Sequence, residues 1–267
     1  MPETTYTIVA LAGGSLESDF RNAGYNVVNK AYLPIGGELM LERVLRAFRS
    51  ARCVERIRVV TQPDAFAAAF GDRARTLADD VISPGNGLID SMLAGFTGLA
   101  PEARVLVSAT DLALLTPEAV DAFAARAAEI AADADIGYGF VSRHAHEAKY
   151  PQVRHTWVRL KEGVFCGAGV SMLRAGSAPK TADLLRRVAA LRKSPLRLAM
   201  LFSPGTWLRM LTGSARISEL EARADEMSGL RCRGVLCDVP ELAVNVDRLA
   251  DLRIAEALLA RSGSATA

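Results

Sequence analysis

Short apolar runs alternate with amphipathic stretches over the first half of the chain. Residues 6–11 form an apolar run followed by a Gly-Gly pair, which is typical of a strand buried on both faces. Similar runs occur at residues 56–61 and 104–109, and a weaker one at residues 78–82. Between the runs, apolar residues recur at helical spacing, which predicts helices over residues 38–51, 63–70, 88–99 and 116–132. Strands and helices that alternate in this way predict a mostly parallel sheet with helices on both faces, a three-layer α/β/α fold.

The pattern changes after residue 135. Strand-like runs cover residues 136–142, 155–160, 164–173 and 235–239. They predict a smaller, mixed sheet next to the first one, and the helical stretch that ends near residue 226 reads as an insertion. A last helix is expected over residues 248–259. No repeat or low-complexity linker divides the chain, so residues 1–267 are predicted to form one domain with two halves, 1–135 and 136–267.

Composition and charge exclude several classes of protein. Half of the 267 residues are hydrophobic and 23% are charged, which is normal for a globular domain with a sizeable core. The net charge is only +2, with acids and bases scattered, so neither nucleic acid nor an anionic membrane is an expected partner. The apolar runs are too short to span a bilayer and the first seven residues are unlike a signal peptide. The four cysteines are dispersed, which indicates reduced thiols and a cytoplasmic location.

Candidate chemistry lies where the predicted strands end, which is where open parallel sheets bind ligands. The turn Leu11-Ala12-Gly13-Gly14 follows the first strand, and its exposed amides could hold phosphate oxygens. A plain strand-ending turn is an equally good interpretation. Lys30 could stabilise negative charge on a departing pyrophosphate, although most lysines are solvated.

Acidic residues at two other strand ends predict a magnesium site. Asp111 follows the strand at residues 104–109, and a carboxylate there could hold Mg²⁺ against phosphate oxygens. Alternatively, Asp111 merely begins a turn. Asn245 and Asp247 follow the last strand and are two residues apart, so they face the same side if the chain is extended. We therefore take Asp111, Asn245 and Asp247 as the candidate metal ligands.

Together these motifs resemble a known family. Ala-Leu-Ala-Gly-Gly stands at residues 10–14, and Asn-Lys-Ala-Tyr-Leu-Pro-Ile-Gly-Gly at residues 29–37. Further matches are residues 87–95, Asp-Leu-Ala-Leu-Leu-Thr at 111–116, Gly-Ala-Gly at 167–169 and Val-Asn-Val-Asp-Arg at 244–248. The series is similar to that of the MobA-like NTP transferases, the nucleotidyltransferases that include molybdenum-cofactor guanylyltransferase and sugar-1-phosphate nucleotidyltransferases. It covers nearly the whole chain in the right order.

The resemblance implies a Rossmann-like nucleotide-diphospho-sugar transferase fold and a Mg²⁺-dependent reaction. A nucleoside triphosphate, GTP or CTP, would bind the first half, and a phosphorylated small molecule would bind the second. The acceptor phosphate would attack the α-phosphorus and release pyrophosphate. The implied catalytic residues are Lys30, Arg21 and Asp111. The implied nucleotide ligands are Leu11, Ala12, Gly13, Gly14, Lys30, Asn86, Gly87 and Ser91, and the implied acceptor ligands are Lys161, Gly167 and Gly169. A homodimer is compatible with the apolar stretch at residues 198–211.

The phosphate loop departs from the family pattern. The family continues Gly-x-Gly-x-Arg, but here Gly14 is followed by Ser15-Leu16-Glu17-Ser18-Asp19-Phe20-Arg21. A glycine is missing, Arg21 is farther away, and two acids would oppose triphosphate binding. The family's Asp-x-Pro is also replaced by Asp111-Leu112-Ala113.

Two other functions therefore stay open. One is a glycosyltransferase of the same fold, although such enzymes usually carry paired aspartates where Thr110 and Leu112 flank Asp111. The other is a nucleotide-binding or regulatory protein without catalysis. A dinucleotide-dependent oxidoreductase is disfavoured, because no Gly-x-Gly-x-x-Gly follows the first strand.

Two smaller groups have a simple interpretation. His144 and His146 could bind a metal, but no third ligand is near them, so they are expected to be polar residues of a strand-end loop. Cys232 and Cys237 are an odd number of residues apart, which favours buried core thiols over a disulfide or zinc site.

Overall fold

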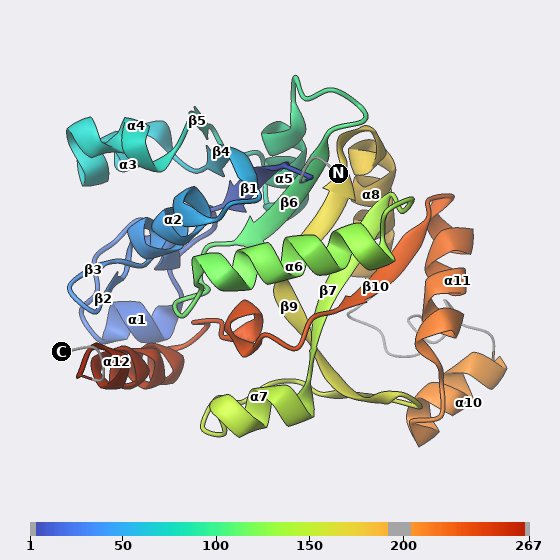
Figure 1. The fold of residues 1–267 in the computed structure, drawn as a ribbon. Coiled ribbons are helices and arrows are strands. Elements are labelled where there is room, and N and C mark those ends of the chain that lie inside the picture. The colour runs from blue at the N-terminus through green and yellow to red at the C-terminus, as the bar shows by residue number, and fades with distance from the viewer. Residues whose placement is uncertain (1–3, 192–203, 265–267) are drawn as a thin grey trace.

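The computed structural model describes residues 4–191 and 204–264 and contains one central sheet of eight strands (Figure 1). The strand order is β10-β7-β9-β6-β1-β4-β5, and β8 pairs with β9. All pairs are parallel except those that β9 makes with β6, β7 and β8. The strands are β1 (Tyr6–Leu11), β4 (Val54–Val60), β5 (Asp80–Ile82), β6 (Arg104–Ala109), β7 (Ile136–Ser142), β8 (Val158–Leu160), β9 (Gly163–Arg174) and β10 (Cys232–Leu236).

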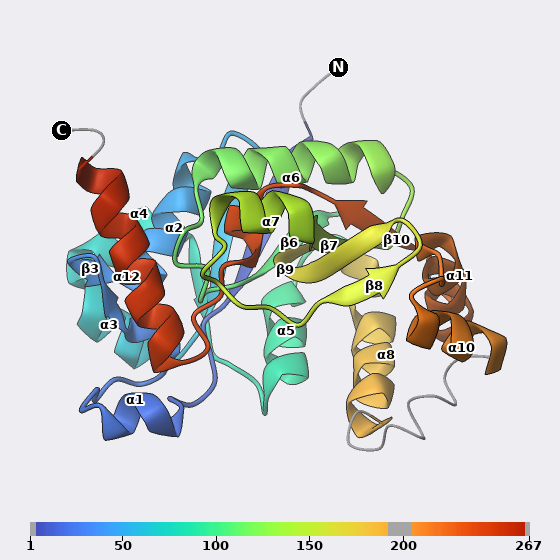
Figure 2. The ribbon, with the colours of Figure 1, turned by 90° about the horizontal axis from the view of Figure 1, so that it is seen from below.

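Helices cover both faces of this sheet, so the predicted three-layer fold is confirmed (Figure 2). One face carries α2 (Met40–Ser50) and α6 (Pro117–Ile130), and the other carries α5 (Leu88–Phe96) and α8 (Ala178–Leu191). The remaining helices are α1 (Ser18–Asn22), α3 (Pro63–Phe70), α4 (Ala74–Leu77), α7 (Arg143–Lys149), α10 (Pro204–Thr212), α11 (Ile217–Ser228) and α12 (Leu249–Ser264). The predicted helical insertion also includes residues 192–203, which lie outside the described residues.

Burial on both faces explains the unbroken apolar runs. Along β1, Ile8 and Ala10 join the core under α2 and α6, while Val9 joins the core under α5. α5 lies close to β1 at Gly95, where a Cβ atom would lie 2.4 Å from Cγ1 of Val9. Only glycine therefore allows α5 to approach β1 this closely.

A two-stranded hairpin forms where the sequence predicts a turn. Its strands are β2 (Pro34–Ile35) and β3 (Glu38–Leu39), and they are antiparallel. The turn residues Gly36 and Gly37 have φ angles of 58° and 86°, which suit a tight hairpin turn. The hairpin leads directly into α2.

The second half differs from the prediction in how its strands are placed. β7, β9 and β10 continue the central sheet instead of building a separate one, because the 12-residue strand β9 lies between β6 and β7 and joins the two halves. Two expected loops also contain helices. α1 lies within residues 15–29, and residues 143–149, expected as a strand-end loop, form α7 with Ser142 as its N-cap.

Candidate functional site

Lys30 and two aspartates meet at the carboxyl end of the central strands. Nζ of Lys30 lies 2.5 Å from Oδ2 of Asp111 and 2.6 Å from Oδ1 of Asp247. The three residues are far apart in sequence, so only the fold brings them together. Burial lowers the pKa of Lys30, but the adjacent carboxylates of Asp111 and Asp247 outweigh it and raise the pKa above the ordinary value. The lysine is therefore an ammonium ion at neutral pH.

Asn245 holds Asp111 in place. Its Nδ2 donates to Oδ1 of Asp111 at 3.1 Å, and the backbone N–H of Val246 donates to the carbonyl of Asp111 at 2.9 Å. Leu112 and Asn245 also form an isolated antiparallel bridge. The segment after β10 is thereby fixed beside the segment after β6. Asp111 is nearly buried, whereas the side chain of Asp247 is 67% exposed and open to a ligand.

Two residues that the sequence analysis did not single out fix the glycine turn. Buried Asn29 donates from Nδ2 to the carbonyl of Ala12, and its Oδ1 accepts from the backbone of Ala31. Thr110 donates from Oγ1 to the carbonyl of Leu11 at 3.0 Å. Asn29 precedes Lys30 in the sequence, and Thr110 precedes Asp111. This adjacency to predicted site residues is the signal by which the sequence could have identified them. The Asn29 side chain thus ties the turn to the short helix that carries Lys30.

One of the two acids that follow Gly14 is directed elsewhere. Asp19 accepts from the backbone N–H of Leu249 at 2.8 Å, so its charge caps the first turn of α12. Arg21 is exposed and donates to the carbonyl of Leu16 in its own loop. The structure does not bring Arg21 to the Lys30 cluster, and its catalytic role stays a prediction.

A cavity of about 500 Å³ opens at these strand ends, and we call it the strand-end cavity. It lies on the α5 and α8 face of the sheet, above β6, β7 and β9. Of the predicted ligands it is lined by Leu11, Gly13, Lys30, Asp111 and Gly169. Other lining residues were not predicted, among them Thr110, Tyr138, Ser171 and Thr181. The cavity is large enough for part of a nucleotide or for a small acceptor.

The segment that carries Asn86, Gly87 and Ser91, predicted to bind the nucleotide, forms a tight turn before α5. Ser91 is buried, and its Oγ accepts from the backbone N–H of Gly85 at 3.1 Å. A Cβ atom at Gly85 would lie 2.5 Å from the backbone of Asp90, so the sequence needs glycine there. Gly87 is the N-cap of α5, with a φ of 92°. Asn86, Gly87 and Ser91 do not line the strand-end cavity, and their contact with a base stays a prediction.

The predicted acceptor residues do not lie together. Gly169 lines the strand-end cavity and packs against Leu112, whose Cδ2 would be 2.7 Å from a Cβ at this position. Gly167 lines a neighbouring cavity. Lys161 is exposed in the β8–β9 turn, and its backbone N–H donates to Ala215. The structure therefore places Lys161 outside both cavities, and acceptor binding by these residues stays a prediction.

The histidines are not arranged as a pair at residues 144 and 146. On α7, His144 is exposed and His146 is fully buried, because residues two apart point in different directions on a helix. His146 instead lies 2.9 Å from His155, measured between the two Nε2 atoms. Across residues 4–191 and 204–264, no group of three or more His, Cys, Asp or Glu residues is placed to hold a metal. All four cysteines are free, and Cys232 and Cys237 are buried, as predicted; Cys53 and Cys166 are also buried.

Comparison with known proteins decides the family. The model of the MobA-like NTP transferase domain matches residues 8–233. The chain belongs to this family. A hypothetical transferase from Thermus thermophilus has 31% sequence identity with it and a TM-score of 0.79, over 93% of this chain and all of that one. Curated protein sequences gave no significant match.

Nucleotidyltransferases also share the fold of this MobA-like NTP transferase at lower identity. One is a CMP:2-keto-3-deoxy-manno-octonic acid synthetase complexed with CTP, at 16% identity and a TM-score of 0.57, covering 97% of this chain and 99% of that one. A nucleotidyl transferase from Methanothermobacter thermautotrophicus has 20% identity and a TM-score of 0.54, with coverage of 97% and 99%. Within the described residues, no helix has the length and apolarity needed to cross a membrane.

Proposed function

We propose that this MobA-like NTP transferase moves a nucleoside monophosphate from a nucleoside triphosphate to a phosphorylated small molecule. An acceptor phosphate oxygen forms a bond to the α-phosphorus, the bond from that phosphorus to the bridging oxygen breaks, and pyrophosphate leaves with the electron pair. The observation that carries the proposal is the ammonium of Lys30, held between Asp111 and Asp247 beside the Gly13–Gly14 turn. No protein nucleophile is needed.

Each residue has a distinct task in this reaction. Lys30 stays charged, since both carboxylates favour its protonated form, and it stabilises the negative charge that develops on the phosphates. The amides of the Gly13–Gly14 turn hold phosphate oxygens in line. Asn245 positions Asp111. In this role Asn245 acts through Asp111 and does not touch the substrate.

The donor set fits Mg²⁺. Two carboxylates already face one cation, the ammonium of Lys30, and magnesium prefers one or two carboxylates together with phosphate oxygens. Asp111 and Asp247 would hold the metal. Asn245 donates to Asp111, and its predicted role as a third metal ligand stays a prediction. When bound, it would neutralise charge on the phosphates and on the departing pyrophosphate. GTP and CTP are the proposed donors, GTP from the family resemblance and CTP from the relative solved with it.

Pyrophosphate release tests the proposal. The protein is incubated with Mg²⁺, each triphosphate in turn and a pool of phosphorylated acceptors. Lys30→Ala and Asp111→Ala should each lower the rate about 10²- to 10³-fold. Lys180→Ala, a change at an exposed lysine of α8, should leave it unchanged. Release at the wild-type rate in both site variants would contradict the mechanism, and calorimetry that detects no triphosphate binding would favour a protein without catalysis.

A further inference from the structure

A second cavity, of about 320 Å³, lies beside the strand-end cavity, and we call it the α11 cavity. It is enclosed by β7, β8, β9, β10 and α11. Its lining is almost entirely apolar and includes Phe140, Leu160, Phe165, Ile217, Leu220 and Ala224. The two charged side chains at its rim are Glu221 and Arg233.

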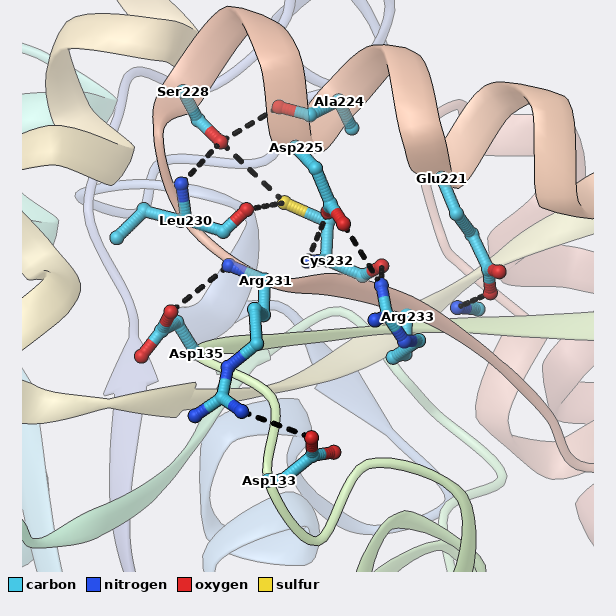
Figure 3. A network of polar contacts seen from close by, with 11 residues as sticks. Asp133, Asp135, Glu221, Ala224, Asp225, Ser228, Leu230, Arg231, Cys232 and Arg233 are labelled. Atoms are coloured by element: carbon cyan, nitrogen blue, oxygen red, sulfur yellow. Dashed lines mark hydrogen bonds and ion pairs between the residues drawn. The ribbon is translucent and has the colours of Figure 1, made fainter.

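Polar contacts hold the helical wall of this cavity against the edge strand (Figure 3). The backbone N–H of Cys232 donates to Asp225 at 2.6 Å, and that of Gly234 donates to Glu221 at 2.7 Å. Cys232 and Gly234 are two residues apart on β10. The carboxylates that their amides contact are four residues apart on α11, which is about one helical turn. Arg233 in turn donates to Asp225 at 3.0 Å. Both rim charges are therefore engaged within the protein, and what the cavity offers a ligand is apolar surface.

Tyr138 lies between the two cavities, because it lines both of them. The ring crosses β9 at Gly167, where a Cβ atom would lie 2.3 Å from the tyrosine hydroxyl oxygen. Only glycine leaves room for the ring at this point. The side chain of Tyr138 is 55% exposed although it stands in the middle of β7. The two cavities are therefore neighbours with Tyr138 between them. The α11 cavity is apolar, and the strand-end cavity contains Lys30 and Asp111.

We propose that the α11 cavity receives an apolar part of the acceptor, an alkyl chain or unsubstituted ring, while the acceptor phosphate lies near Lys30. The placement of the acceptor phosphate near Lys30 rests on the proposed function, whereas the binding of an apolar group in the α11 cavity does not. Its support is the adjacency of the two cavities at Tyr138, the apolar lining and a wall held by three hydrogen bonds. Fixed, apolar concave sites of this size are the usual places for hydrophobic ligand groups.

A series of n-alkyl phosphates tests the inference. Ethyl, butyl, hexyl and octyl phosphate are titrated into the full chain by calorimetry with Mg²⁺ present. We expect the affinity to rise about fourfold for each methylene until the cavity is full. Ala224→Phe fills the cavity and should abolish the gain. Ala222→Phe places the same ring on the exposed side of α11 and should keep it. Ala224→Met serves if the larger ring prevents folding, as judged by circular dichroism.

Pyrophosphate release in the same samples separates the two proposals. The α11 cavity is overturned as a binding site if affinity does not depend on chain length. It is also overturned if affinity depends on chain length equally in the residue-224 variants and in Ala222→Phe. Both conclusions hold even where triphosphates release pyrophosphate. Chain-length-dependent binding that residue 224 controls supports the cavity even where no triphosphate reacts. In that case the proposed transfer reaction is contradicted and the proposed binding site is not.

Discussion

Lys30 stays charged in a partly buried position because the carboxylates of Asp111 and Asp247 contact its ammonium. The effect of other acidic residues on the site likewise depends on which partners the fold gives them. Asp19 would oppose a triphosphate if it faced the Gly13–Gly14 turn, but it caps α12 instead. Of the two acids in the divergent loop, Asp19 therefore already has a partner away from the turn.

The two glycines of the turn should respond differently to alanine. Gly14 has a φ of 101°, which strains any residue with a Cβ, and Gly14→Ala should lower the free energy of unfolding by about 1–2 kcal/mol. At Gly13 a Cβ would meet only Pro84, at 3.8 Å, so Gly13→Ala should leave the melting temperature nearly unchanged. Because Gly13 lines the strand-end cavity, the same change should weaken triphosphate binding about tenfold in calorimetry. Unchanged affinity in Gly13→Ala would place the phosphates elsewhere.

Buried His146 should make the protein less stable in weak acid. Burial and the neighbouring His155 lower the pKa of His146 to about 4, against partial compensation by Glu147 and Glu241. Between about pH 6.5 and pH 4 the unfolded chain therefore binds more protons at this site, and the free energy of unfolding should fall by up to about 1.4 kcal/mol per pH unit as pH decreases.

Urea unfolding at several pH values measures this effect. His146→Gln keeps a nitrogen near His155 but does not titrate, so its stability should depend less on pH than that of the wild type. His144→Gln alters an exposed histidine of the same helix and should keep the wild-type dependence. Equal slopes in wild type and His146→Gln would show that other groups dominate.

At the scale of elements, α11 completes the edge of the sheet. β10 pairs with β7 on one side only, so its outer amides need other partners. Glu221 and Asp225 provide them from α11. This arrangement explains how a strand can end the sheet beside an apolar cavity without leaving buried amides unpaired.

Removing one of these carboxylates should loosen the edge. Asp225→Ala leaves the amide of buried Cys232 without its acceptor, and the free energy of unfolding in urea should fall by about 1–3 kcal/mol. Glu226→Ala is the matched control. It breaks only an exposed pair with Arg223 and should cost about 0.5 kcal/mol or less. Similar effects of both changes would argue against the edge contact.

At the scale of the whole molecule, β9 joins the two halves into one sheet, so the chain should unfold in a single cooperative transition. A triphosphate with Mg²⁺ at 100 times its dissociation constant should stabilise the protein by about 2.7 kcal/mol and raise the melting temperature by about 5–10 °C. Scanning calorimetry measures both effects. Lys30→Ala should lose most of the shift, and two separate transitions would contradict the single domain.

The sequence by itself determined the elements whose signals are local. β1, β6, β7 and α3 were predicted with the bounds that the structure has, because apolar runs mark the strands and Pro63 marks a helix start. Lys30, Asp111 and Asp247 were predicted as site residues from their order and their places at strand ends, and the structure brings them together. α1 and α7 were missed, since polar sequences carry little periodicity.

Only the tertiary structure decided what depends on distant partners. The convergence of Lys30 with both aspartates, the capping of α12 by Asp19 and the pairing of His146 with His155 each join residues that no local pattern relates. The same holds for the position of the Tyr138 ring between the two cavities, which needs Gly167 of β9 where the ring crosses. Apolar periodicity reports which face of an element is buried, but the partner across the sheet or loop is set by the packing of the complete chain.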